Sequence, residues 1–114
     1  MRYQMKLRSQ PFQMIRSGQK TIELRLNDEK RRLLKADDEI EFCCVDRSEA
    51  PLVVRVRALH RFDSFAQLYA ALPLLKCGYT GETISDASPE DMLRYYSAEE
   101  QARYGVVGIE IELA

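Results

Sequence analysis

Four segments of the chain alternate apolar and polar residues, and this alternation limits the possible folds more than any other feature. It is clearest in residues 107–113, where valine, isoleucine and leucine alternate with glycine and glutamate. Similar alternation marks residues 20–26, 39–44 and 52–60. The strands are too closely connected for a parallel βαβ sheet. The sequence therefore predicts an antiparallel or mixed sheet that curls towards a barrel.

Short helices are predicted beside these strands. In residues 10–18, Pro11 is placed for the first helical turn and Gly18 for the position just after the helix. Residues 64–71 are predicted to be helical, and serines that suit the N-cap position open further helical segments at Ser88 and Ser97. Four or five strands with two to four short helices predict a single α+β domain over residues 1–114.

Composition excludes several classes of protein. The chain is 46% hydrophobic and 31% charged, which argues against disorder, and its net charge is −1. A chain with this balance has no polybasic coat, so any site for a polyanion must be a local basic patch. No apolar run is long enough for a membrane helix and residues 1–7 do not resemble a signal peptide, so the expected location is the cytoplasm without membrane contact.

The cysteines and the one histidine do not suggest a metal or disulfide site. An odd count of three cysteines argues against a disulfide framework. Cys43 and Cys44 are adjacent and would point to opposite faces of a strand, unlike a redox or zinc motif. His60 has no second histidine to share a metal. We expect buried or half-buried thiols, no metal and no cofactor, and the sequence contains no P-loop or dinucleotide fingerprint.

The strand at residues 20–26 carries the most informative polar residues. Thr21, Glu23 and Arg25 fall on one strand face with neighbours ~7 Å apart, and Lys20 lies where the chain enters the strand. A hydroxyl, a carboxylate and two cations suit a pocket for a polar heterocycle or a phosphate. The alternative is a solvated strand face whose Glu–Arg pair contributes only ~0–1 kcal/mol.

Other residues offer weaker signals for nucleic-acid binding. Arg55 and Arg57 share the polar face of the strand at residues 52–60, and together with the basic connection at residues 30–35 they would form a stripe that follows a sugar–phosphate backbone. Acidic residues are interspersed, which favours an ordinary mixed-charge surface. Several tyrosines are candidates for stacking on bases, with core packing as the alternative for each: Tyr79, Tyr95, Tyr96 and Tyr104.

Four stretches resemble the ASCH domain signature: residues 5–7, 11–28, 38–42 and 95–111, with a Gly-x-Lys-Thr motif at residues 18–21. The resemblance covers nearly the whole chain and implies a PUA-like β-barrel with flanking short helices. It also implies a cleft beside the Gly-x-Lys-Thr strand and an association with RNA or nucleotides.

Some small bacterial proteins of this type are amidohydrolases that deacetylate N4-acetylcytidine with a lysine, a threonine and a glutamate. Lys20 matches the lysine. Their threonine lies three residues later, where this chain has Glu23, whereas Thr21 matches a neighbouring motif threonine. Glu82 is the nearest candidate for the glutamate by its order along the chain. A Lys20–Glu23 pair would favour a charged lysine, whereas a general-base lysine must lose its proton.

Three hypotheses follow. The first is a module that binds RNA or a nucleotide-like ligand, with these candidate ligand-binding residues: Lys20, Thr21, Glu23, Arg25, Arg55 and Tyr96. The second is an amidohydrolase acting on N4-acetylcytidine-type nucleosides, with these candidate catalytic residues: Lys20, Thr21, Glu23 and Glu82. The third is a protein-interaction module without a ligand, which predicts that the C-terminal helices cover the polar strand face. The oligomeric state stays open.

Overall fold

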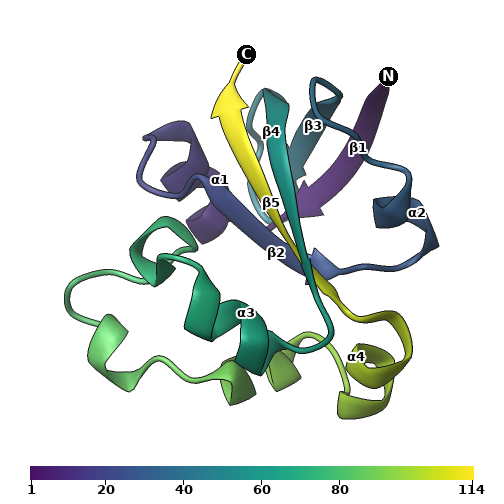
Figure 1. The fold of residues 1–114 in the computed structure, drawn as a ribbon. Coiled ribbons are helices and arrows are strands. Elements are labelled where there is room, and N and C mark those ends of the chain that lie inside the picture. The colour runs from purple at the N-terminus through teal and green to yellow at the C-terminus, as the bar shows by residue number, and fades with distance from the viewer.

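One five-stranded sheet organises the computed structural model, which describes residues 1–114. The strands run in the order β1-β3-β4-β5-β2, and the sheet curls into a half-barrel (Figure 1). Their bounds are Arg2–Leu7 for β1, Ile22–Leu26 for β2, Glu39–Cys44 for β3, Leu52–Phe62 for β4 and Val106–Leu113 for β5. β1 pairs in parallel with β3, and all other neighbours are antiparallel. The mixed, curled sheet predicted from the sequence is confirmed.

Seven short helices surround this sheet. The α-helices are α1 (Ser9–Arg16), α2 (Glu29–Arg32), α3 (Phe65–Ala71) and α4 (Ala98–Tyr104), and the 3₁₀ helices are η1 (Leu74–Lys76), η2 (Ile84–Asp86) and η3 (Pro89–Arg94). The predicted serine caps at Ser88 and Ser97 are confirmed, each within a capping box, and Ser64 caps α3 by accepting from the Gln67 amide. In Figure 1, α3 and the 3₁₀ helices lie together on the lower side of the sheet, beside β2 and β5.

Three elements differ from the sequence prediction. β1 was not predicted as a strand, and the charged connection after β2 contains the single turn α2. In β4, a register shift between Val56 and Ala58 interrupts the alternation. Leu59, rather than Ala58, therefore packs against the core beyond this point, so the alternation predicted for residues 52–60 is wrong after Val56.

The hydrophobic core has two parts. The larger cluster fills the half-barrel, with Phe12, Ile40, Phe42 and Val54 fully buried. The smaller cluster lies between β2 and the helical segment, where Ile22 and Leu24 of β2 pack with residues such as Phe65 and Leu68 of α3. The apolar face of β2 therefore holds the helices, and its polar face turns towards the inside of the half-barrel.

Strand register confirms where that polar face points. Glu23 is the partner of Ile109, and Arg25 is the partner of Val107. Directly opposed residues of an antiparallel pair lie on the same face of the sheet. Ile109 and Val107 belong to the core of the half-barrel. The side chains of Glu23 and Arg25 therefore lie on the inner face of the sheet, on the side where the half-barrel is open.

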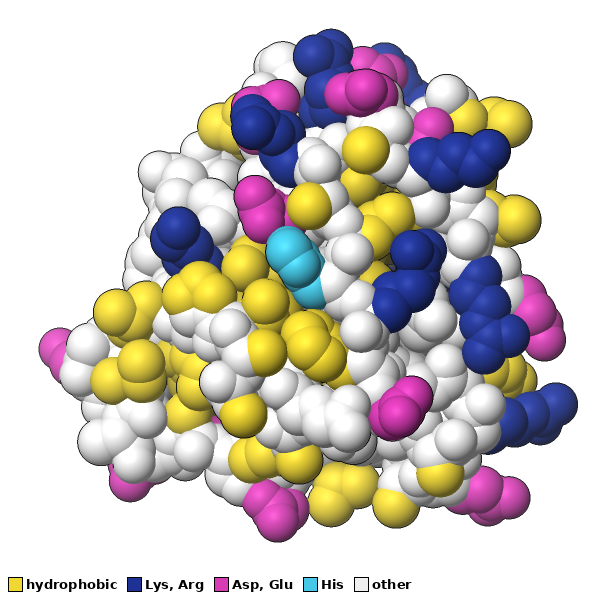
Figure 2. Space-filling model, in the orientation of Figure 1, with side chains coloured by type: hydrophobic (Ala, Val, Ile, Leu, Met, Phe, Trp, Pro, Cys, Tyr) yellow, Lys and Arg dark blue, Asp and Glu magenta, His cyan; other side chains and the backbone are white.

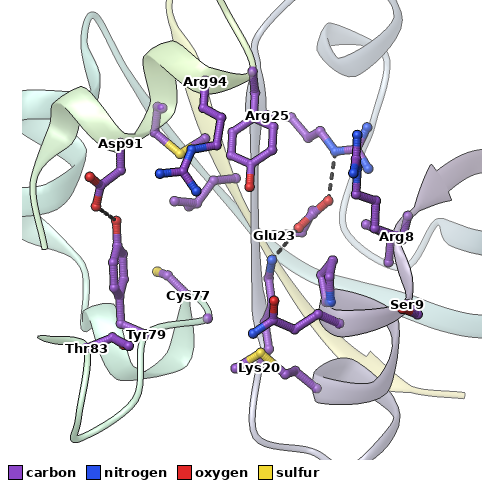
Figure 3. Close-up of a pocket in the computed structure, with 18 of the residues that line it drawn as sticks. Arg8, Ser9, Lys20, Glu23, Arg25, Cys77, Tyr79, Thr83, Asp91 and Arg94 are labelled. Atoms are coloured by element: carbon purple, nitrogen blue, oxygen red, sulfur yellow. Dashed lines mark hydrogen bonds and ion pairs between the residues drawn. The ribbon is translucent and has the colours of Figure 1, made fainter. Parts of the chain in front are cut away.

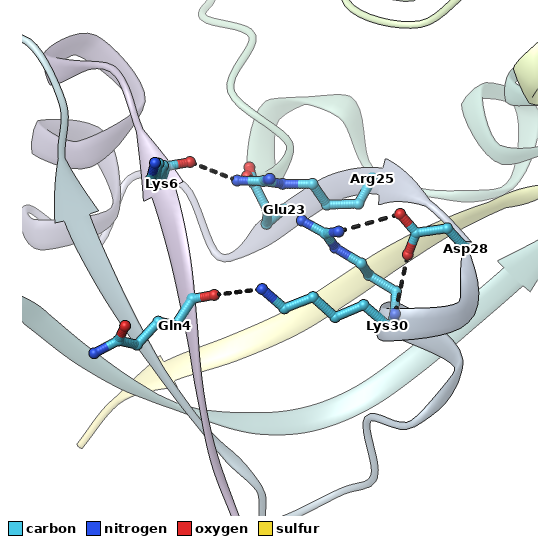
Figure 4. Close-up of polar contacts among 7 residues, drawn as sticks. Gln4, Lys6, Glu23, Arg25, Asp28 and Lys30 are labelled. Carbon is cyan, nitrogen blue, oxygen red and sulfur yellow. Dashed lines mark hydrogen bonds and ion pairs between the residues drawn. The ribbon is translucent and has the colours of Figure 1, made fainter.

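The half-barrel is open between its two edge strands, β1 and β2, and we call this opening the seam. Side chains bridge the seam in place of backbone pairing (Figure 4). Arg25 Nη2 donates to the carbonyl oxygen of Lys6 at 2.9 Å, and Lys30 Nζ donates to the carbonyl oxygen of Gln4 at 3.0 Å. Charged side chains from β2 and α2 thus satisfy carbonyl groups on the free edge of β1.

Candidate functional site

A cavity of about 880 Å³, which we call the main pocket, lies between two walls (Figure 3). One wall comes from the end of β1, from α1 and from β2, and the other comes from the segment between α3 and η3. Its volume is in the range of small-molecule binding sites. The lining combines aromatic rings with charged groups of both signs.

A buried carboxylate between two cations lies deep in this pocket. Glu23 Oε1 is 2.7 Å from Lys20 Nζ, and Glu23 Oε2 is 2.8 Å from Arg25 Nε. Lys20 and Glu23 are only 9% and 4% exposed. This burial excludes the alternative, left open by the sequence, that the polar face of this strand is solvated. Each carboxylate oxygen thus has its own cationic donor, and the three groups, which we call the Glu23 cluster, carry one excess positive charge.

Electrostatics within the Glu23 cluster keep the carboxylate ionised. Burial opposes its charge, but the charges and hydrogen bonds of Lys20 and Arg25 outweigh burial and hold the pKa of Glu23 below its usual range. Burial likewise opposes the charge of Arg25, and Glu23 outweighs it and raises the pKa of the guanidinium. Glu23 and Arg25 are therefore both ionised at neutral pH.

Local backbone structure explains why Lys20 points into the pocket. Gly18 ends α1 with a φ of 86°, as its position in the sequence predicts, and the Lys20 amide then donates to the Met14 carbonyl at 3.0 Å. The Lys20 side chain lies against Gly78, where an added Cβ would be 3.5 Å from Cδ of the lysine. The Thr21 amide donates to the Lys76 carbonyl at 2.9 Å, which joins the two walls.

The opposite wall holds a chain of hydrogen bonds. Tyr79 Oη donates to Asp91 Oδ2 at 2.6 Å, and the hydroxyls of Tyr69 and Tyr79 are 2.7 Å apart. Because the Tyr79 hydroxyl donates its proton to Asp91, the Tyr69 hydroxyl must be the donor to the Tyr79 oxygen. Burial and the Asp91 hydrogen bond raise the pKa of Tyr79, and the same bond lowers the pKa of Asp91. This wall therefore carries a fixed carboxylate and two neutral phenols.

Two adjacent tyrosines of this wall have different environments. Tyr96 is half-buried and stacks on Phe65 with ring centroids 6.3 Å apart, and burial raises the pKa of its hydroxyl. Tyr95 is 62% exposed while lining the same pocket. The two neighbouring rings therefore differ, since Tyr96 packs against the smaller core cluster while Tyr95 is open to solvent.

The pocket also contains cations that the sequence analysis missed. Arg8 follows β1 and Arg94 ends η3, and both line the main pocket without a carboxylate within 4.0 Å (Figure 3). These arginines lie 86 residues apart in the sequence (94 − 8). No local pattern relates them, because only the packing of α3 to η3 against β2 brings them to one cavity.

The predicted site residues fall into two groups. The structure brings five of them to the lining of the main pocket: Lys20, Glu23, Arg25, Glu82 and Tyr96. Thr21 lies just before β2 and does not line the pocket. Arg55 is exposed on β4, where its strand partners are Glu39 and Glu112, and it also lies outside the pocket.

The three thiols are free, and Cys77 alone is fully buried, as expected for structural cysteines. Burial raises the pKa of Cys77 to about 11, against a smaller opposing effect of Lys20. Since the thiolate is the reactive form, we expect Cys77 to resist iodoacetamide in the folded protein at about pH 8. Mass spectrometry after brief labelling should show Cys77 unmodified without denaturant and modified in urea. Rapid native labelling of Cys77 would contradict this environment.

The structure shows neither a metal-binding cluster nor a membrane-spanning helix. No group of three or more histidine, cysteine, aspartate or glutamate residues is arranged to hold a metal ion. No helix has the length and apolar character needed to cross a membrane.

Comparisons with known proteins agree on one family. The model of the ASCH domain matches residues 5–114. The crystal structure of hypothetical protein PH0355 is 30% identical, with a TM-score of 0.81 and coverage of 100% of both chains. The solution structure of protein PF0455 from Pyrococcus furiosus is 34% identical, with a TM-score of 0.73 and coverage of 99% of this chain and 97% of that one.

A more distant structure shares the fold. A variant of the ZmASCH protein from Zymomonas mobilis is 12% identical, with a TM-score of 0.66 over 96% of this chain and 67% of that one. A search of curated proteins found no significant match.

Proposed function

Because the chain belongs to the ASCH domain family, we propose that its main pocket binds a nucleotide, either free or within RNA. The observation that supports this most directly is the Glu23 cluster, which places two cations and one carboxylate deep in a cavity of about 880 Å³. The side chains that carry the excess positive charge are already largely shielded from bulk water. Such a group favours a ligand with carbonyl or anionic oxygens over a purely apolar one.

The opposite wall suits the flat, aromatic part of such a ligand. Tyr95 is largely exposed at the pocket, and Tyr96 stacks on Phe65 and so has a fixed ring plane. Bases that are not paired bind proteins by stacking on tyrosine rings and by hydrogen bonds along their edges. A base between these rings and the Glu23 cluster would use both kinds of contact.

Hydrolysis of an N4-acylated nucleoside is the second candidate, because Lys20 and Glu23 face each other inside the pocket. Lys20 Nζ lies 2.7 Å from Glu23 Oε1, as expected for an ammonium that donates its proton rather than accepts one. In this arrangement Lys20 suits the role of a hydrogen-bond donor to an acyl oxygen better than that of a general base. This geometry favours binding over hydrolysis.

The hypothesis of a protein-interaction module without a ligand predicts that helices cover the polar face of β2. Instead, Glu23 and Arg25 border a cavity that the helical segment encloses on its other side. The arrangement therefore favours a ligand within the pocket.

A pair of arginine variants tests the proposal. Arg94→Gln should weaken binding of ribonucleoside 5′-monophosphates about 10-fold, since it removes one charged donor from the pocket. Arg103→Gln removes the same charge from an exposed position of α4 outside the pocket and should leave the affinity unchanged. Isothermal titration calorimetry measures both. Equal effects of the two variants, or no binding by the unmodified protein at millimolar nucleotide, would refute the proposal.

Hydrolysis is tested separately by mass spectrometry of N4-acetylcytidine after incubation with the protein and with Lys20→Ala. Turnover that disappears in the variant would make the pocket an active site, with Lys20 among its catalytic residues. Absence of turnover alongside nucleotide binding would leave the binding function in place.

A further inference from the structure

A second cavity, of about 400 Å³, lies at the seam, and we call it the seam pocket. Seven residues line it: Gln4, Met5, Lys6, Arg25, Lys30, Arg31 and Cys43. Four of these are cations and none is a carboxylate, although the net charge of the chain is −1. Figure 2 also shows Lys and Arg side chains gathered on the side of the molecule where α2 lies.

The cations of the seam pocket are only partly neutralised. Arg25 shares Glu23 with Lys20, and Arg31 Nη1 contacts Asp28 Oδ2 at 3.1 Å. Lys30 Nζ is held by the neutral carbonyl of Gln4 (Figure 4), and Lys6 forms no ion pair. The Nε atom of Arg31 is buried and has no hydrogen-bond partner. An unsatisfied buried donor among several cations is a costly arrangement unless an acceptor completes it.

The seam pocket adjoins the main pocket. Lys6 and Arg25 line both cavities. The Arg25 guanidinium spans them, because its Nε contacts Glu23 while its Nη2 reaches the Lys6 carbonyl on β1. The Arg25 side chain thus lies between the two cavities, and a ligand that extends from the main pocket into the seam pocket would displace its contact with the Lys6 carbonyl.

We propose that the seam pocket binds a phosphate group of the ligand whose base lies in the main pocket. This inference rests on the proposed function and deepens it, since it makes the preferred ligand a phosphate ester rather than a nucleoside. A phosphate offers several acceptor oxygens, which match the separate donors of Lys30, Arg31 and Lys6. The phosphate comes either from the end of a mononucleotide or from the backbone of an RNA chain.

The test uses two lysine variants from the same region. Lys30→Gln removes a cation of the seam pocket, and Lys35→Gln removes an exposed cation outside both pockets. Affinities are measured for the four ribonucleosides, their 5′-monophosphates and a mixed octaribonucleotide. In parallel, inorganic phosphate is titrated into ¹⁵N-labelled protein, and the amide shifts of residues 30 and 31 are followed. Thermal unfolding of both variants confirms that they fold.

We expect the monophosphates or the octaribonucleotide to bind more tightly than the nucleosides. Lys30→Gln should remove about 10-fold of that advantage, equivalent to about 1.4 kcal/mol, and Lys35→Gln should remove none. Tighter binding of monophosphates would identify a terminal phosphate as the occupant. Tighter binding of the oligonucleotide would identify a backbone phosphate.

The two proposals fail in different ways. If nucleosides bind the main pocket but phosphate adds no affinity, or if both lysine variants weaken binding equally, the seam pocket is not a phosphate site. If inorganic phosphate shifts residues 30 and 31 in a Lys30-dependent way while no nucleoside binds, the seam inference stands as an anion site. In that case, base recognition in the main pocket is refuted.

Discussion

Replacing Glu23 by glutamine is expected to lower the free energy of unfolding by about 3–5 kcal/mol, the range for breaking a buried ion pair. Glutamine keeps the shape of the side chain but removes the only negative charge between Lys20 and Arg25. Two cations would then remain in a buried site without a counter-charge. Urea denaturation followed by circular dichroism at neutral pH measures the loss.

A matched control distinguishes the loss of a buried charge from the loss of a paired charge at the surface. Glu112 pairs with Arg57 at 2.8 Å, but both side chains are largely exposed, at 43% and 57%. Glu112→Gln should therefore cost at most about 1 kcal/mol. Similar losses for Glu23→Gln and Glu112→Gln would contradict the buried charge cluster.

The pH dependence has a definite sign. The folded protein holds the pKa of Glu23 below its ordinary value of 4.5, so the folded state binds fewer protons at this group than the unfolded state does. The stabilisation by the carboxylate is complete above that ordinary value and is lost as the pH falls through the folded pKa. The stability difference between the parent protein and Glu23→Gln should thus stay constant from about pH 6 to 8 and shrink in acid.

Gly105→Ala is expected to cost about 1–3 kcal/mol from backbone conformation, with a further loss from steric contact. Gly105 has φ 72° and ψ −172°, a region that is almost restricted to glycine. An added Cβ would lie 3.0 Å from the Phe62 carbonyl oxygen, which is rigid backbone. Gly105 joins α4 directly to β5, so the strain would act on a central strand. Chemical denaturation gives the magnitude.

Two other glycines separate the effect of backbone conformation from that of steric contact. Gly18 has φ 86° with nothing near its virtual Cβ, and Gly81 has neither a positive φ nor a close neighbour. The expected order of destabilisation is Gly105→Ala, then Gly18→Ala, then Gly81→Ala. Equal losses at Gly105 and Gly18 would show that the Phe62 carbonyl contributes nothing.

Strand periodicity predicted most of the fold. β3 has its predicted bounds, and β5 alternates as predicted as far as Ile111, with Val107, Ile109 and Ile111 on the core of the half-barrel. Val106 on its other face packs in the smaller cluster, and Leu113 is exposed. β1 has the same signal, since Tyr3, Met5 and Leu7 alternate with polar residues, but the strand is short and lies far in sequence from its partner. The bulge in β4 depends on its register with β5, which the local pattern does not encode.

The candidate site was predictable mainly on the wall that β2 contributes. Lys20, Glu23 and Arg25 are close in sequence, so strand geometry alone brings them together. Arg94 and Asp91 come from a 3₁₀ helix whose position depends on packing across the smaller core cluster. Sequence reasoning identified the Lys20–Glu23 pair and named Tyr96 and Glu82 singly, but it did not predict that they share one pocket with Arg8 and Arg94.

The position of β5 in the sheet has a consequence for the synthesis of the chain. β5 lies between β4 and β2, and β2 has no other strand partner. Residues 106–113 are therefore required before β2 joins the sheet and before the two walls of the main pocket close. During synthesis on a ribosome, β2 would remain unpaired until residues 106–113 leave the exit tunnel. Assembly then depends on pairings between distant parts of the chain, which makes folding slow relative to a helical domain of this size.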